Sequence, residues 1–132
     1  MMKSPQQELY DYVFLQSMKK GYDTYDHLPM ASENVGYPFV TLENMNMAPI
    51  TTKTSIGAEI NLTVNVWGNQ DQRLVIDTMA SSLLMIASTG FKTADYRYRG
   101  RMTGSDYQII QDTSVPDTVL NHAVVNLKFN LV

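Results

Sequence analysis

The chain has 132 residues, the size of one domain with a single core, and its 44% hydrophobic and 17% charged content is typical of a globular protein. A net charge of −3 argues against a protein that mainly coats nucleic acid, and the absence of cysteine excludes disulfides and thiolate metal sites. With no apolar signal segment and no run approaching ~18 apolar residues, we expect neither a secretory signal nor a membrane-spanning helix.

The first predicted element is a helix that starts after Ser4. Ser4 is a favourable N-cap, Pro5 suits the first helical position, and Gln7 can complete a capping box. Gly21 is the expected C-cap. The apolar face of this helix contains Leu9, Tyr12, Val13, Phe14 and Met18.

Two weakly patterned stretches flank the next element. Residues 22–36 are rich in turn-forming residues and predict a loop, and residues 44–55 predict a polar connection without a period. Between them, residues 37–43 predict a strand that begins at a proline. Because loops often carry contacts with other proteins, we take four of their side chains as candidate partner contacts: Tyr22, Tyr25, Met45 and Met47.

Residues 56–67 carry the clearest pattern in the chain. Apolar residues alternate strictly with Glu59, Asn61, Thr63, Asn65 and Trp67, which is typical of a strand buried on one face. At roughly 3.3 Å per residue, such a strand spans about 40 Å, which is more than a small core requires. Its second face is polar and nearly uncharged, so we expect it to meet other protein or a water-lined channel.

A second helix is predicted over residues 72–88, with Asn69 as its cap and Gln72 in a capping box. Strands are predicted over 91–98, 107–111 and 123–131. The predicted buried stripe of this helix is Val75, Met79, Leu83 and Ile86, flanked by Leu74, Ile76 and Ala87.

Together these elements predict one α+β domain over residues 1–132. Its order is α-β-β-α followed by two or three strands, which form a mostly antiparallel sheet packed against two α-helices. We expect the second helix to cover residues 60, 62, 64 and 66 of the long strand and residues 125, 127 and 129 of the last one.

No set of residues in the sequence predicts catalysis. Asp23, Asp26 and His27 lack the spacing of a calcium loop, His122 falls on the polar face of a strand, and Ser105 is not in a nucleophile elbow. No phosphate-binding glycine motif is present. We therefore predict a protein that is not an enzyme and holds no metal or cofactor.

The run from Tyr96 to Arg101 alternates tyrosine with arginine. If it is extended, Arg97, Arg99 and Arg101 share one face, where they could bind phosphates or form ion pairs between subunits with acids such as Glu59 or Asp77. Three arginines in an acidic chain are a weak nucleic-acid signature, so the pattern favours a subunit contact.

The order of elements resembles the small tail terminator, or tail-to-head joining, proteins of long-tailed bacteriophages. The resemblance is carried by Tyr37-Pro38-Phe39-Val40 and Val66-Trp67-Gly68, and the element order matches over nearly the whole chain. It implies an α+β fold and a six-membered ring of identical subunits without catalytic residues. Such a ring caps the finished tail tube and binds the head-completion or connector protein. The implied location is the head–tail interface of a virion assembled in the host cytoplasm.

Two alternatives remain open. Another head–tail connector or tail-tube protein of the same virion would share the sheet and the ring, and the order of neighbouring genes would distinguish it. A small nucleic-acid-binding accessory protein would instead depend on the three arginines, and a salt-dependent gel shift would reveal it. In a tail ring, contact with DNA would be only passing.

Overall fold

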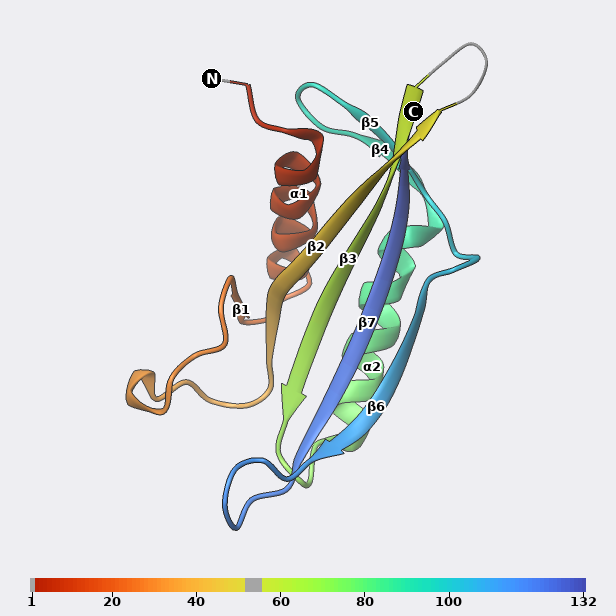
Figure 1. The fold of residues 1–132 in the computed structure, drawn as a ribbon. Coiled ribbons are helices and arrows are strands. Elements are labelled where there is room, and N and C mark those ends of the chain that lie inside the picture. Colours follow the sequence, from red (N-terminus) through yellow and green to blue (C-terminus); the bar gives the residue numbers. More distant parts are fainter. Residues whose placement is uncertain (1, 52–55) are drawn as a thin grey trace.

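The computed structural model describes residues 2–51 and 56–132, which form a twisted sheet with helices on one face (Figure 1). The elements in chain order are α1 (Pro5–Lys19), β1 (Thr24–Tyr25), a 3₁₀ turn (Ala31–Glu33), β2 (Phe39–Thr51), β3 (Ile56–Gly68), α2 (Arg73–Leu84), a second 3₁₀ turn (Met85–Ser88), β4 (Gly90–Lys92), β5 (Arg97–Gly100), β6 (Asp106–Asp112) and β7 (Leu120–Leu131). The α+β class with a mostly antiparallel sheet is confirmed.

The sheet has seven strands, and β7 is its most connected member. The main order is β1-β2-β3-β7-β5-β4, and β6 also pairs with β7. All pairs are antiparallel except β1 with β2. One edge of β7 pairs with β3, and its other edge pairs with β5 near the C-terminus and with β6 near its start. Both long predicted strands are therefore internal to the sheet.

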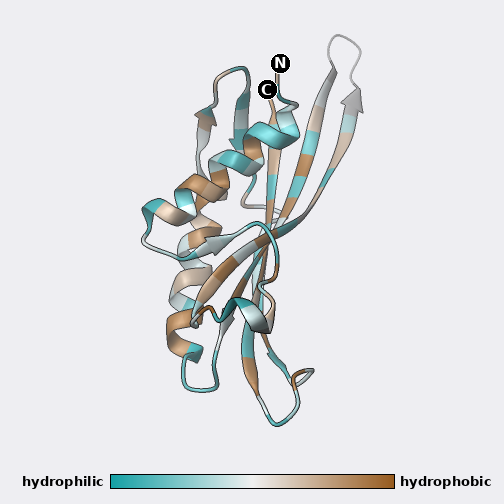
Figure 2. Cartoon of the chain, turned by 90° about the vertical axis from the view of Figure 1, so that its left-hand side faces the viewer, coloured by the Kyte–Doolittle hydropathy of each residue, from teal (hydrophilic) through white to brown (hydrophobic). Residues whose placement is uncertain are grey.

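The core lies between one face of this sheet and the two helices. Alternating residues of β3 and β7 are fully buried against α1 and α2, and Figure 2 shows the matching alternation of brown and teal along the strands. The strand residues of the core include those predicted: Ile60, Leu62, Val64, Val66, Val125, Leu127 and Phe129. No α-helix formed by the described residues lies on the opposite face of the sheet, which is called the helix-free face below.

Helix α1 begins and ends as its sequence predicts. The Ser4 side chain accepts a hydrogen bond from the Gln7 backbone N–H at 3.0 Å, and Pro5 occupies the first turn. Gly21 follows with φ of 88°, a conformation that glycine adopts without strain. The Gln7 side chain binds Asp11 and does not complete a capping box.

The predicted connection over residues 44–55 is wrong for residues 44–51, because β2 continues to Thr51. A register shift lies between Leu42 and Asn44, which leaves Glu43 as an extra residue in the ladder with β3. This bulge reverses which positions face the core, so that Met45 and Met47 follow Leu42 on the helix side. Core-facing and outward-facing positions alternate on each side of the bulge, but the alternation does not continue through it. The sequence pattern therefore did not predict the whole strand. Residues 52–55 lie outside the described residues.

The predicted burial of α2 is also partly wrong. Ile76 is fully buried with Met79, Ala80 and Leu83, whereas Val75 is 46% exposed. The reciprocal contacts predicted for Asn69 and Gln72 are present, since the Asn69 N–H donates to Gln72 Oε1 at 2.9 Å and Asn69 Oδ1 accepts the Asp71 N–H at 3.0 Å. They lie in the turn before the helix, which begins at Arg73 without a side-chain cap of its own. The predicted strand over 91–98 is a hairpin of β4 and β5.

We expect Leu83→Ala to lower the free energy of unfolding by about 2–5 kcal/mol, because it leaves a cavity in the core. Val75→Ala should change it by less than about 0.5 kcal/mol, because that side chain lies largely in solvent. Urea unfolding of both variants measures the difference. Equal losses would show that the buried face of α2 is misassigned.

Candidate assembly surfaces

Among the described strands, the outer edges of β1 and β4 are open over two and three residues, and β2 and β6 have the two longer open edges. Strand β1 covers β2 only at Val40 and Thr41, so the rest of β2 has no strand on its outer side. Strand β6 pairs with β7 on one side only. An unpaired strand edge presents backbone N–H and C=O groups that can pair with another chain.

The direction of the backbone groups on β6 follows from its partner. Lys128 of β7 donates its N–H to Ser105 Oγ at 2.9 Å and accepts the Arg101 N–H at 2.9 Å, so even-numbered residues of β7 direct their groups toward β5 and β6. The alternation of an antiparallel ladder then directs the backbone groups of Tyr107, Ile109 and Gln111 to the open edge.

The same reasoning applies to β2. The Val40 N–H bonds to Asp23 and the Leu42 carbonyl accepts the Tyr10 hydroxyl, so both groups point away from β3. Beyond the bulge, the register with β3 directs the backbone groups of Met45 and Met47 to the outer edge. Pro49 has the same direction, so its missing N–H costs no bond to β3.

The helix-free face is polar and carries few charges. Thr63, Asn126 and Asp106 form a hydrogen-bonded row across β3, β7 and β6, and Lys128 pairs with Glu59 at 3.3 Å. Within the described part of the chain, the buried Oδ1 atom of Asn130 has no hydrogen-bond donor.

The three arginines lie beside this face. Arg97 and Arg99 are exposed on β5 while Tyr98 between them is buried, as the alternation predicted, and Arg101 follows the strand. None of the ion pairs found among residues 2–51 and 56–132 involves these arginines. Glu59 already pairs with Lys128 within the chain, so it is a poorer partner between subunits than the sequence suggested.

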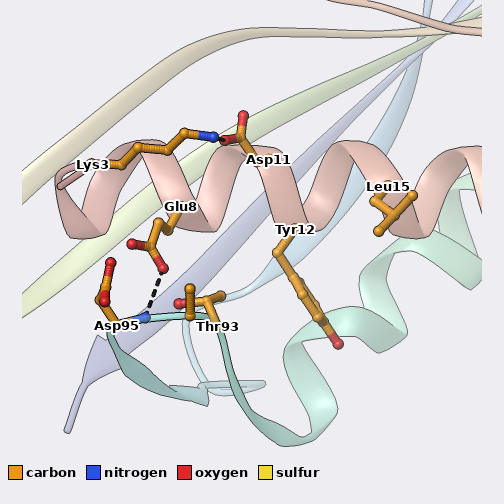
Figure 3. A pocket seen from close by; sticks show the side chains of 8 residues that line it. Lys3, Glu8, Asp11, Tyr12, Leu15, Thr93 and Asp95 are labelled. Atoms are coloured by element: carbon orange, nitrogen blue, oxygen red, sulfur yellow. Dashed lines mark hydrogen bonds and ion pairs between the residues drawn. The ribbon is translucent and has the colours of Figure 1, made fainter. Parts of the chain in front are cut away.

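The hairpin that carries Arg97 and Arg99 is fastened to the first turns of α1. Tyr98 donates its hydroxyl to the Pro5 carbonyl at 2.6 Å, and the Asp95 N–H bonds to the Glu8 carboxylate at 3.1 Å (Figure 3). Hydrogen bonds from Thr93 and Asp95 lower the pKa of Glu8, and burial raises the pKa of Tyr98 to about 12. A cavity of about 420 Å³ lies beside these contacts.

Gly100 holds β5 close to the 3₁₀ turn (Met85–Ser88) that follows α2. A Cβ atom there would lie 2.2 Å from the Ala87 carbonyl oxygen, which is backbone and cannot move aside. Only glycine permits this approach. This close approach fixes the position of β5, the strand that carries Arg97 and Arg99.

The four candidate partner contacts are only partly exposed to solvent. Tyr22 packs against the core, and Tyr25 lies in β1 with its ring edge-on to Phe39 at 5.8 Å. Met45 and Met47 lie in β2 and not in a loop; Met45 packs against the core, whereas Met47 is 39% exposed. The structure does not bring these four side chains together in one site.

The segment 26–38 lies beside β2 at one end of the helix-free face (Figure 1). Tyr37 stacks on Phe39 with ring centroids 5.2 Å apart, and Trp67 stacks on His122 at 3.8 Å. His122 Nε2 donates to Asn65 Oδ1 at 2.7 Å, since an amide oxygen only accepts. Burial lowers the pKa of His122.

His27 is held in this segment by two carboxylates. Its ring nitrogens lie 2.8 Å from Asp26 and 3.2 Å from Glu33, and the hydrogen bonds to Asp26 and then Glu33 raise its pKa. The described residues contain no group of three or more histidine and acidic side chains that could hold a metal ion. None of the helices described is long and apolar enough to cross a membrane.

Two solved structures share the fold over nearly the whole of both chains. A chain from the virion of a native gene transfer agent particle matches with a TM-score of 0.63 and 14% identity, covering 97% of this chain and 94% of that one. A second structure, whose name describes no function, matches with a TM-score of 0.53 and 13% identity, covering 98% and 97%. No protein-family model and no curated protein matches. At these identities the likeness shows the fold.

We expect the two histidines to titrate on opposite sides of the ordinary value of 6.5. His27 should titrate above it, so its contribution to stability is full at low pH and is lost as pH rises through its folded-state pKa. His122 should titrate below it, so acidification through 6.5 destabilises the fold. Proton NMR of the ring resonances measures both, because the chain has only two histidines. His27→Gln assigns the signals; coincident midpoints would contradict the assigned environments.

Proposed function

We propose that this chain is a structural virion protein that forms a ring at the end of a phage-type tail tube and joins it to the head connector. The observation that carries the proposal is the near-complete match to a chain of a gene transfer agent virion. The element order that resembles tail terminators, with Tyr37-Pro38-Phe39-Val40 and Val66-Trp67-Gly68, supports the finer assignment.

The two longer open edges, those of β2 and β6, supply a contact between identical subunits. Strands β2, β3, β7 and β6 alternate in direction, so the edge of β6 would meet the edge of β2 from the next subunit in the antiparallel sense. The contact joins two different surfaces of one chain, and such heterologous contacts close into a ring when the rotation between subunits allows it.

The open parts of β2 and β6 lie at diagonally opposite corners of the sheet. Asn46 is level with Lys128 of β7, whereas Ile109 is level with Ala123, which is five positions away or roughly 16 Å at 3.3 Å per residue. Joining them offsets successive subunits along the strands. A closed cyclic sheet requires such a stagger together with strands tilted to its axis, so the offset suits a ring.

In this arrangement, the arginines lie beside the boundary between subunits. Strands β5 and β6 pair with the same edge of β7, and Arg101 lies between them. We assign Arg97, Arg99 and Arg101 to contact with the neighbouring subunit. The neutral helix-free face would line the path of the DNA without holding it.

We expect Gln111→Pro to prevent ring formation, because it removes an N–H that faces the open edge of β6. Gln111→Ala is the matched control: it removes the same exposed side chain and keeps the N–H. Sedimentation velocity gives the oligomeric state, and urea unfolding checks that the subunit remains folded. A ring formed equally well by both variants would exclude this edge.

Electron microscopy of the protein mixed with tail tubes tests the function itself. We expect a ring at one end of each tube, and a phage that lacks the protein should make filled heads and unjoined tails of abnormal length. Normally joined particles without the protein would contradict the proposal. Rings bound along the tube would favour a tail-tube protein, and rings bound only at the connector would favour another head–tail connector protein.

A nucleic-acid-binding role is the second candidate, because the three arginines are exposed and without ion-pair partners among the described residues. A gel shift that weakens with salt and disappears when Arg97, Arg99 and Arg101 are changed to glutamine would support it. Replacement of Lys19 and Lys20, exposed at the end of α1, is the matched control.

A further inference from the structure

A groove of about 400 Å³ lies at one end of the helix-free face, between segment 26–38 and the loop that joins β6 to β7 (the lower end in Figure 1). Aromatic and aliphatic side chains dominate its lining, and Phe39 and Leu120 are buried there. Several apolar side chains along the groove remain substantially exposed: Leu28, Met30, Tyr37 and Val115.

The segments that form this end are acidic. Residues 26–39, 67–71 and 112–120 contain five carboxylates and one histidine, but no lysine or arginine. Asp112 lines the groove, and hydrogen bonds from the Ser114 hydroxyl and backbone N–H lower its pKa, so it is ionised at neutral pH. Arg73, at the start of α2, is the nearest cation along the chain from the second of these segments.

We propose that this groove binds another protein through an apolar side chain flanked by lysine or arginine. The apolar lining supplies the hydrophobic contact, and the surrounding carboxylates favour a basic neighbour and oppose an acidic one. The same charges exclude a nucleic acid or an anionic membrane as the occupant. The groove is complete within one chain, so the inference does not rest on the proposed ring.

A second copy of the chain is a poorer occupant. Two copies that meet at this end would bring their carboxylates together, and like charges oppose each other. The basic residues of β5 lie toward the other end of the strands, so a contact between the two ends would be heterologous and would extend into a filament unless the rotation between copies closed it. A different protein with a basic, apolar-tipped segment satisfies the groove without this consequence.

Trp67 reports directly on the groove, because it lines the cavity and is the only tryptophan in the chain. Its fluorescence is followed while three short synthetic peptides are added to the full chain at low salt. The first alternates lysine with leucine, the second glutamate with leucine, and the third lysine with serine. We expect saturable binding of the first, at least about tenfold weaker binding of the other two, and weakening by salt.

Val115→Arg should weaken binding of the lysine–leucine peptide at least about tenfold, because it places a cation and a larger side chain in the groove. Val75→Arg is the matched control, since its side chain is 46% exposed compared with 45% for Val115, and Val75 lies outside the groove. Asp117→Asn removes one charge and keeps a residue type that tolerates its φ of 57°. It should weaken binding less, without disturbing the fold.

Three results would overturn the inference. They are equal binding of the three peptides, no saturable change for any of them, or equal loss in the Val115→Arg and Val75→Arg variants. A fourth would replace the occupant: if the Trp67 signal changes with protein concentration alone, and Val115→Arg abolishes that change, the groove binds a second copy.

Discussion

Eleven consecutive residues of β3 pair with eleven of β7, and the rest of the fold is arranged around this ladder. Its buried face receives α2, whose Ile76, Met79 and Leu83 pack onto the alternating apolar residues of both strands. Because β3 occupies one whole edge of β7, the remaining strands must share the other. Strand β5 pairs with one end of that edge and β6 pairs with the other. Between them, the Lys128 backbone bonds to Arg101 and to Ser105, which lie in the loop that joins β5 to β6.

This sharing determines where the sheet stays open. On the far side of β3, β1 covers only the first part of β2, so the open portion of β2 lies diagonally opposite the open edge of β6. A flat sheet with edges open along their full length could pair in many registers. Two short edges at opposite corners define one offset, and that offset is what a tilted, closed arrangement of strands requires.

The sequence predicted the elements in which one period persists. Residues 56–67 and, apart from Val124, residues 123–131 keep one period-two alternation, and Ser4, Pro5 and Gly21 each act locally, so these features were correct. The prediction from sequence failed where a contact with another element changes which residues face the core. The bulge at Glu43 separates two alternating runs of β2, and in α2 Ile76 is buried in place of Val75, because it packs into the space that Gly68 of β3 leaves open. The groove could not be foreseen, because its lining comes from three segments that only the fold brings together.

Open strand edges also carry a hazard, since they template the pairing of any exposed strand. This chain limits the hazard on both edges. Pro49 removes a donor from β2 on its outer side, and Asp106 and Asp112 place a charge at each end of β6. The proline and the two aspartates shorten the part of each edge that can pair with another strand. The centres of the edges, near Met47 and Ile109, remain able to pair. A partner must therefore match both the short length and the diagonal offset, and in the proposed ring the neighbouring subunit does so while leaving neither of these edges open for further growth.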